Sequence, residues 1–267
     1  MSAGPLPAPL PQVLETDLLI LAEREDWAHG RAASTAGAAL LARTTPQGEV
    51  LMARGAAVEV EDLLDAEARL RRRSGAEPAL WLSAPRDVVV PARVLDALGL
   101  VPFSQWDWMA LEAADALGGA DLPGGTSIRA VDVSSEAEVA VVREVLRRTN
   151  PRSTADPLAA PEVAWAGAYD GDALVGVFGA RGEQGHGEGA SWHLHGLGVL
   201  AEKRGRGLGR ALTAHLAAVG LAAGADWISL GLYAENDAAR RLYRRLGFTT
   251  RAEMSSYGPA SATRPLR

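Results

Sequence analysis

Hydrophobic residues along this chain recur at two spacings, and their alternation predicts a mixed α/β protein. Leucines and valines three or four residues apart, with charges between them, predict amphipathic helices, whereas short continuous or alternating apolar runs predict strands. In the second half of the chain this pattern predicts helices from Glu136 to Arg148, from Leu208 onward, and between Asn236 and Phe248. Strands are expected at 126–131, 163–169, 173–180, 192–200, 227–233 and 249–257.

The first half of the chain shows a similar order of elements. Helices are expected at 14–27, 60–73 and 89–98, and strands at 37–43, 49–53, 79–82 and 103–111. Leu98-Gly-Leu100 before a strand with Met109 parallels Leu246-Gly-Phe248 before a strand with Met254. We therefore expect a degenerate copy of the second domain, the alternative being an unrelated small α/β domain that covers it.

Glycine and proline mark the expected boundaries. Residues 1–11 contain four prolines and are expected to be a flexible lead-in, and 118–125 is a glycine-rich linker. The sequence thus predicts domains at 12–117 and 126–258, with a tail at 259–267.

Composition narrows the function classes. The chain has 267 residues, 48% of them hydrophobic, a formal charge of −6 and no cysteine. Its acidic balance argues against nucleic acid as a partner, and the lack of cysteine excludes disulfides and thiolate chemistry. No apolar run is long enough for a membrane span, and the first residues lack the basic and apolar regions of a signal peptide, so we expect a cytoplasmic protein.

A glycine-rich turn between the strand at 192–200 and the following helix is the strongest chemical signal. Arg204-Gly-Arg-Gly-Leu-Gly209 lets the backbone turn tightly at the start of a helix, where unpaired N–H groups and the helix dipole favour an anion such as phosphate. The last glycine is followed by Arg210-Ala211, which excludes a P-loop. The spacing Gly-x-Gly-x-Gly likewise differs from the dinucleotide fingerprint.

Arg204-x-x-Gly207-x-Gly209 resembles the Q/R-x-x-G-x-G/A pyrophosphate signature of the GNAT superfamily of N-acetyltransferases. Asn236, Leu242-Tyr243 and Leu246-Gly247-Phe248 follow in that family's order and spacing. The resemblance covers about 126–258. It implies the GNAT acyl-CoA N-acyltransferase fold, in tandem with the degenerate first domain, acetyl-CoA as co-substrate, and transfer of acetyl to a primary amine of a small molecule or peptide by direct attack.

The resemblance also implies which residues bind the coenzyme. The pyrophosphate is expected on the backbone of the turn, the thioester beside the end of the histidine strand, and further contacts from the helix after Asn236, which alternatively only caps that helix. The expected coenzyme-binding residues are Leu197, Gly198, Val199, Arg204, Gly205, Arg206, Gly207, Leu208, Gly209, Arg210, Asn236, Ala239 and Tyr243.

Three side chains are candidates for proton transfer. His193 and His195 share one strand face, and His193-Leu-His195 resembles the His-x-His strand of the arylalkylamine N-acetyltransferases, where the pair relays protons; each histidine could instead be a packed core residue. Tyr243 matches the family's general acid for the departing thiolate, or is a core tyrosine. Two imidazoles without a third ligand argue against zinc, and His215 is expected to be packed.

The sequence gives less information about which residues bind the acceptor amine. Loop 150–161 is a candidate lid, loop 182–189 is expected to be flexible, and Trp106, Trp108, Tyr233 and Tyr257 line a pocket or lie in the core. Two alternatives stay open: a non-catalytic acyl-CoA-binding sensor, and a mycothiol synthase-like acetyltransferase. We expect no metal cofactor, no membrane partner, and a monomer or homodimer.

Overall fold

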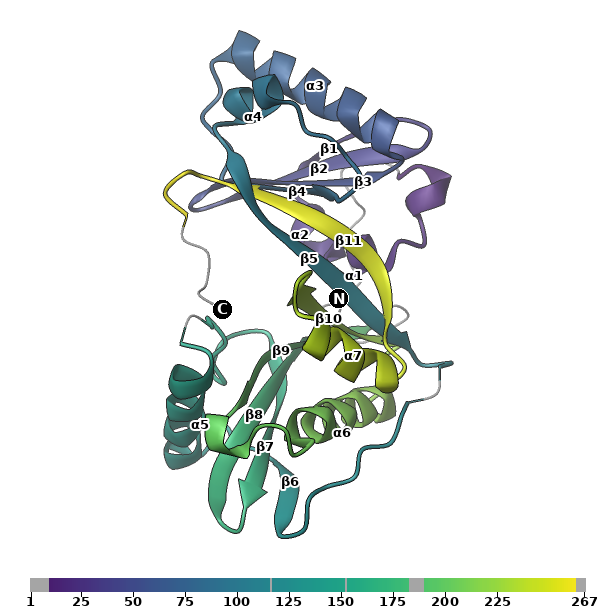
Figure 1. Cartoon of the computed structure of the whole chain (residues 1–267). Coiled ribbons are helices and arrows are strands. Elements are labelled where there is room, and N and C mark those ends of the chain that lie inside the picture. Colours follow the sequence, from purple (N-terminus) through teal and green to yellow (C-terminus); the bar gives the residue numbers. More distant parts are fainter. Residues whose placement is uncertain (1–9, 116, 152, 183–189, 263–267) are drawn as a thin grey trace. The chain divides into compact units, whose positions relative to one another are not determined.

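The structure is a computed structural model that describes residues 10–115, 117–151, 153–182 and 190–262. These residues form two compact units that interleave along the chain (Figure 1). Unit 1 comprises the described residues up to Trp108, Tyr233–Glu235 and those from Arg251 on, whereas unit 2 comprises Met109–Leu232 and Asn236–Thr250. The N-terminal lead-in is therefore almost entirely outside the described residues, as are 183–189 of the expected flexible loop and the end of the expected tail.

Unit 1 follows the predicted order of elements with two differences. The elements are η1 (Gln12–Leu14), α1 (Leu18–Ala22), α2 (Arg24–Trp27), β1 (Arg31–Ser34), β2 (Ala38–Thr45), β3 (Gly48–Gly55), α3 (Ala57–Ser74), β4 (Trp81–Pro85), α4 (Ala92–Leu98) and β5 (Val101–Glu112). The single helix expected at 14–27 is wrong: two short helices, α1 and α2, lie in that range. The Asp17 carboxylate accepts hydrogen bonds from the N–H groups of Leu19 and Ile20 and so starts a new helix there. Strand β1 was not predicted, because its small and polar residues do not alternate with large apolar ones.

The strands of unit 1 lie in the order β1-β2-β3-β4-β11-β5, where β11 (Thr249–Gly258) comes from the C-terminal end of the chain. The β2–β3 hairpin is antiparallel, whereas β3 and β4 are parallel and connected through α3. The core includes the fully buried Leu40, Leu51, Leu64 and Leu82. Helix α3 therefore covers the sheet with the apolar stripe that its sequence spacing predicts.

Unit 2 has the elements predicted for it. They are β6 (Thr126–Ala130), α5 (Glu136–Thr149), β7 (Glu162–Asp170), β8 (Ala173–Gly182), β9 (Ser191–Val199), η2 (Ala201–Lys203), α6 (Leu208–Ala222), β10 (Trp227–Tyr233) and α7 (Asp237–Arg245). The strand order is β10-β9-β8-β7-β6. Neighbouring strands are antiparallel except β9 and β10, which are parallel and connected through α6.

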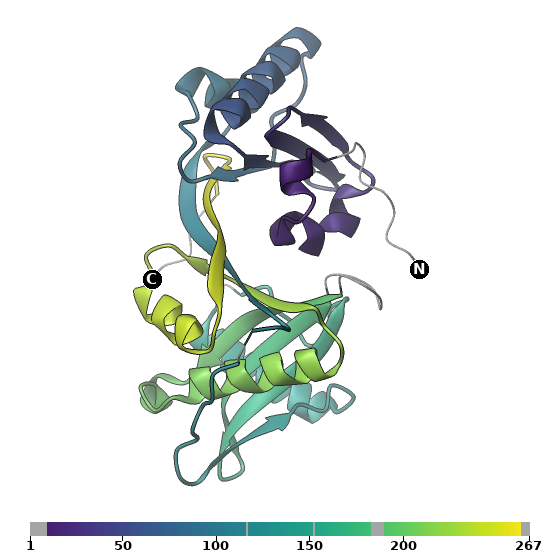
Figure 2. The same cartoon turned by 90° about the vertical axis from the view of Figure 1, so that its right-hand side faces the viewer.

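Two helices cover the sheet of unit 2. Helix α5 contributes Val142, Val145 and Leu146 to the core, and α6 contributes Leu212 and Leu216. The two helices lie on opposite faces of the strands (Figures 1 and 2). Strand β9 of this sheet leads through η2 into the glycine-rich turn.

The two halves of the chain repeat one plan. Three strands, a helix, a strand, a helix and a strand follow one another from β1 to β5 and again from β7 to β11, and in each half the helix connects a parallel pair. This repeat favours the degenerate copy over an unrelated cover domain. Strands β5 and β11 each have residues in both units, so the geometric units are interleaved, and the domain boundaries expected at 118–125 stay a prediction. No helix within the described ranges is long and apolar enough to span a membrane.

Candidate functional site

Strands β9 and β10 are paired over only part of their length. Their parallel register runs from Ser191 opposite Trp227 to Leu194 opposite Leu230 and ends there. Strand β9 nevertheless continues to Val199 and β10 to Tyr233. The second half of β9, which begins at His195, thus has an edge toward β10 with no registered strand partner among the described residues.

A bulge in β9 lies at the same point. On the β8 side His195 is opposite Gly179 and Gly198 is opposite Val177, so β9 holds one extra residue between these pairs. Gly196 has φ +72°, a left-handed conformation that favours glycine. A Cβ there would come within 2.8 Å of Ala155 in the loop after α5. The candidate lid 150–161, apart from Arg152, is described, and its Ala155 lies against the bulge.

The turn after β9 has the geometry of an anion site. Gly205 and Gly207 both have positive φ, +75° and +85°. The first helical bond of α6 runs from the Ala211 N–H to the Gly207 carbonyl, so the N–H groups of Leu208, Gly209 and Arg210 precede it and have no acceptor within the helix. Ideal Cβ atoms would meet nothing within 4 Å at Gly205 and only the Asp121 carbonyl, at 3.8 Å, at Gly207. The backbone of the turn is therefore accessible to a phosphate group.

The basic side chains of the turn differ in their surroundings. Arg204 donates from Nε to the Val199 carbonyl at 2.9 Å and so closes the turn. Lys203 Nζ lies 2.6 Å from the Asp170 carboxylate and Arg206 lies 3.6 Å from it. The hydrogen bond from Lys203 lowers the pKa of Asp170, which keeps that carboxylate charged beside both cations. Because of this, Arg206 contributes less net charge to the site than its sequence position suggests.

A buried carboxylate holds one of the two histidines. His195 Nε2 lies 2.9 and 3.1 Å from the two carboxylate oxygens of Glu162, and the Trp165 indole N–H donates to Glu162 at 2.7 Å. The Glu162 side chain is 9% exposed and that of His195 20% exposed. Glu162 was not singled out in the sequence, because a lone glutamate at the start of a strand carries no signal without knowledge of what lies opposite it.

His193 has a different environment. Its Nδ1 lies 2.9 Å from the Ser229 hydroxyl on β10. Burial, together with the charges of Arg181 and His195, lowers the pKa of His193 to about 3. A histidine with such a pKa is neutral at physiological pH and a weak base. Burial therefore argues against His193 as the group that accepts a proton.

Tyr243 lies on α7, where that helix approaches the turn. A Cβ at Gly209 would lie 3.6 Å from Leu242 Cδ1 and 3.7 Å from Leu197 Cδ2, so the ends of β9, α6 and α7 meet there. The Tyr243 side chain is buried, and this burial raises the pKa of its phenol to about 12. The phenol therefore keeps its proton at neutral pH.

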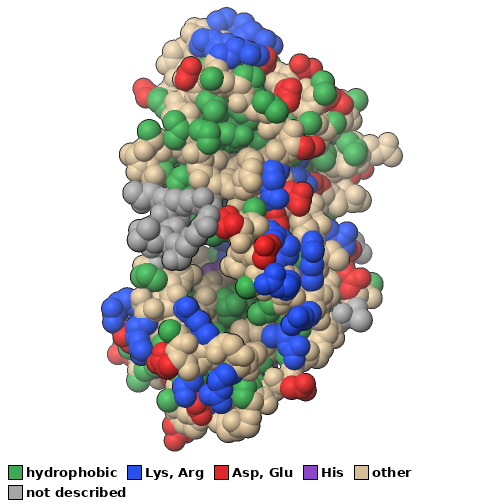
Figure 3. Space-filling model, in the orientation of Figure 1, with side chains coloured by type: hydrophobic (Ala, Val, Ile, Leu, Met, Phe, Trp, Pro, Cys, Tyr) green, Lys and Arg blue, Asp and Glu red, His purple; other side chains and the backbone are tan. Residues whose placement is uncertain are grey.

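Helix α7 brings two further features to this region. The Asn236 side chain accepts a hydrogen bond from the Ala239 N–H at 3.1 Å, which confirms that Asn236 caps α7. Lys and Arg side chains gather over the part of unit 2 where α7 lies (Figure 3), and α7 contributes Arg240, Arg241, Arg244 and Arg245. The coenzyme contact expected of Asn236 and Ala239 stays a prediction.

The remaining candidate residues lie elsewhere. His215 is half-buried on α6, and burial lowers its pKa. Trp108 is buried in unit 1, and Trp106 donates to the Ser256 hydroxyl at 2.7 Å. Tyr233 and Tyr257 also belong to unit 1. Throughout the described ranges, no group of three or more His, Asp or Glu side chains is arranged to hold a metal ion.

Comparisons with known proteins match this chain to acetyltransferases. The model of the acetyltransferase (GNAT) family matches residues 136–248. The mycothiol acetyltransferase of Beutenbergia cavernae is 30% identical over 209 residues, which are 68% of this chain and 67% of that protein.

Two solved structures share the fold. A GCN5-related N-acetyltransferase from Kribbella flavida has a TM-score of 0.58 at 20% identity, over 92% of this chain and 96% of that one. A GCN5-related N-acetyltransferase from Sphaerobacter thermophilus has a TM-score of 0.56 at 19% identity, over 83% and 76% of the two chains.

Proposed function

The chain belongs to the GNAT acetyltransferase family, and from this premise we propose that it transfers the acetyl group of acetyl-CoA to a primary amine of a small molecule or peptide. The observation that carries the proposal is the meeting of three features in unit 2. The open helix terminus of α6 lies close to Leu197 of β9, the strand with the free edge, and to Leu242 of α7, the helix that carries the buried Tyr243. A site for phosphate, a site for a thioester and an acid are the parts that acetyl transfer needs.

The residues of the turn fit the coenzyme. The N–H groups of Leu208, Gly209 and Arg210, with the positive end of the α6 dipole, would bind the pyrophosphate, and Arg204 would hold the turn in place. Leu197, Gly198 and Val199 would lie along the pantetheine, because that part of β9 has a free edge. The bound thioester supplies an activated acetyl carbonyl, and a backbone N–H at the bulge would stabilise the charge that develops on its oxygen.

His195 and Glu162 would prepare the amine. At neutral pH an amine is mostly an ammonium ion and must lose a proton before it can attack the carbonyl carbon. In our proposal His195 takes that proton, and the charge of Glu162 stabilises the resulting imidazolium. With Nε2–H donated to Glu162, Nδ1 is the nitrogen that accepts.

Tyr243 would complete the reaction. As the C–N bond forms and the C–S bond breaks, the departing thiolate needs a proton. The phenol of Tyr243, with its raised pKa, is still protonated and supplies it. As the amide forms, its nitrogen loses a second proton, which restores the Tyr243 phenol, so the net change is one proton moved from the ammonium ion to His195.

Release of free CoA in the presence of an amine panel tests the proposed activity. The chain has no cysteine, so the protein itself does not react with a thiol reagent, and for acceptors without a thiol the reagent reports the CoA that is set free. We expect at least one primary amine to release CoA in proportion to acetylated product. If acetyl-CoA binds but no amine in a broad panel of small molecules and peptides releases CoA, the proposal fails in favour of the non-catalytic sensor.

Replacing Glu162 by Gln should separate its role from coenzyme binding. We expect kcat to fall about tenfold to a hundredfold, with acetyl-CoA affinity unchanged, because a neutral amide stabilises the imidazolium less well. Glu144→Gln, an exposed change on α5, is the matched control and should leave kcat unchanged. The ¹⁵N NMR spectrum should show His195 protonated at Nε2 in the unchanged protein. Protonation at Nδ1 instead, or an unchanged kcat for the Glu162 variant, would contradict the assignment.

A narrower candidate for the acceptor follows from one relative. The B. cavernae protein is named a mycothiol acetyltransferase, and its similarity extends over two thirds of this chain, further than the GNAT family match alone. This favours the formation of mycothiol as the specific acetylation. The immediate precursor amine of mycothiol belongs in the panel, and a kcat/KM at least a hundredfold above that of simple amines would support it.

A further inference from the structure

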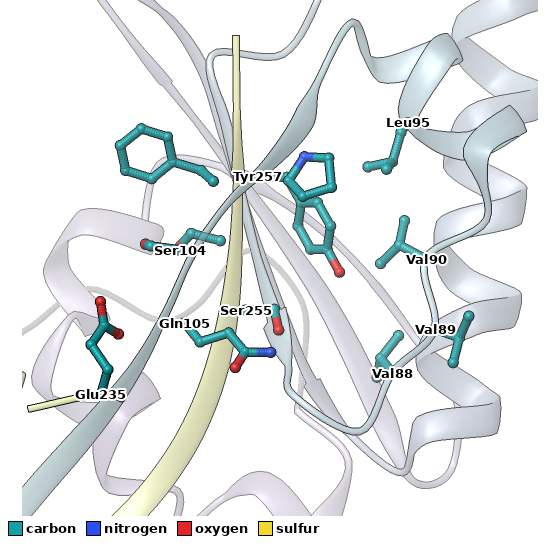
Figure 4. Close-up of a pocket in the computed structure, with 12 residues that line it drawn as sticks. Val88, Val89, Val90, Leu95, Ser104, Gln105, Glu235, Ser255 and Tyr257 are labelled. Atoms are coloured by element: carbon teal, nitrogen blue, oxygen red, sulfur yellow. The ribbon is translucent and has the colours of Figure 1, made fainter. Parts of the chain in front are cut away.

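Unit 1 contains a pocket whose lining includes none of the residues assigned to acetyl transfer. It has a volume of about 520 Å³, within the range of small-molecule sites. Its lining comes from β5, β11, the β4–α4 loop, Leu95 of α4 and Glu235 (Figure 4). All of these residues belong to unit 1.

One side of this pocket is polar. Ser104 and Gln105 come from β5, and Ser255, Ser256 and Tyr257 from β11. In Figure 4 the side chains of Gln105 and Tyr257 extend toward the side on which Val88, Val90 and Leu95 lie. Burial raises the pKa of Tyr257, so its hydroxyl stays protonated and can donate a hydrogen bond.

The polar residues of β11 are unusual for a buried strand. Ser255, Ser256 and Tyr257 are consecutive and only 8%, 5% and 9% exposed. Strands buried on both faces are normally apolar, because burying a hydroxyl without a partner costs free energy. Ser256 accepts a hydrogen bond from Trp106, and Ser255 hydrogen-bonds with Tyr257. A hydroxyl group can donate one hydrogen bond and accept two, so each of these side chains can form a further hydrogen bond. A ligand that hydrogen-bonds to this wall would give the polar run a function.

The opposite side is aliphatic. The wall consists of Val88, Val89, Val90 and Leu95, with Pro102 and Phe103 from β5. Val89 is 72% exposed, which is high for a valine, and it lies at the rim. An occupant would therefore have aliphatic carbon on one side and hydroxyl or amide groups on the other.

The charge of the lining residues restricts the chemical class of the ligand further. Glu235 is the charged residue of the lining, and neither Lys nor Arg is among the described lining residues. A phosphate or carboxylate would lie beside an acidic side chain and no basic one of this lining, whereas an ammonium group would be attracted by the negative charge of Glu235. Unit 1 also lacks the phosphate turn, since only Ala56 separates β3 from α3. A second coenzyme molecule is thus not the expected occupant.

We propose that this pocket, lined by the polar run of β11 and the valines of the β4–α4 loop, binds a small neutral or cationic molecule that carries a hydroxyl group at one end and a compact aliphatic group at the other. None of the residues that line this pocket has been assigned to acetyl transfer, so the proposal stands whether or not the proposed reaction is correct.

Three probes of nearly equal shape test the charge and polarity of the site. Choline is cationic, 3,3-dimethylbutan-1-ol is its neutral counterpart and 3,3-dimethylbutanoate is anionic. Saturation-transfer NMR and titration calorimetry with the full chain should show binding of the first two and none of the third. Choline should bind about threefold more tightly than the alcohol because of Glu235, and Glu235→Gln should remove that preference.

Two tyrosine variants locate the bound probe. Tyr257→Phe should weaken binding of choline and of the alcohol about fivefold, the effect of one lost hydrogen bond. Tyr169→Phe, a matched change in unit 2, should leave both affinities unchanged, and so should His195→Gln. Equal binding of the anion, no binding of any probe, or a loss caused by His195→Gln but not by Tyr257→Phe would each overturn the proposal.

Discussion

The Gly207→Trp variant should lose acetyl-CoA binding, with an affinity at least about a hundredfold lower. Gly207 has φ +85° and immediately precedes the free N–H groups of α6, so a tryptophan there strains the backbone and places its ring in front of the donors. Losing two hydrogen bonds to a charged phosphate, at about 1.5–3 kcal/mol each, accounts for a hundredfold or more. Titration calorimetry with acetyl-CoA measures the effect directly.

A control at the other end of the same helix separates binding from strain. Gly224 follows α6, has φ +92° and has no atom within 4 Å of an added Cβ. Gly224→Trp therefore imposes a comparable backbone strain far along the helix from the turn, and should keep full affinity. Unchanged binding by the Gly207 variant would mean that the turn does not hold the coenzyme, and the assignment of the whole site would fail with it.

Tyr243→Phe should reduce kcat by about a hundredfold to ten-thousandfold, the range that one general acid contributes, while acetyl-CoA binding is retained. The ring stays in its buried position between α7 and the core, since the substitution removes only the hydroxyl. Single-turnover measurements of CoA release, at saturating acetyl-CoA, would isolate the chemical step.

The pH dependence adds a second readout for Tyr243. Because burial raises the pKa of Tyr243 to about 12, its ionisation should not lower the rate until the pH approaches that value. Tyr169→Phe, on a strand of unit 2, is the matched control and should have an unchanged kcat. A Tyr243→Phe variant with full turnover would show that the thiolate receives its proton elsewhere.

The spacing of apolar residues and glycines along the sequence was sufficient to predict most helices and strands and the glycine-rich turn. The strand, the glycine turn and the helix from Ser191 to Ala222 appear where apolar spacing and glycine positions predict them. The repeat of the plan in both halves followed in the same way from the order of short segments. The prediction of one helix at 14–27 was wrong because the Asp17 side chain caps the start of a new helix within this range. Apolar spacing and helix propensity alone do not show where such a side chain interrupts a helix.

What the sequence by itself determined is the order of elements, the family signature and the candidate turn, because each depends on residues that are neighbours along the chain. Only the tertiary structure decided that Glu162 supports His195 from another strand, that burial lowers the pKa of His193 while raising that of Tyr243, and that β5 and β11 take part in both units. These properties depend on desolvation and on pairings between residues far apart in the chain. No local pattern encodes them, since the same side chains in another register would have different neighbours and different acidities.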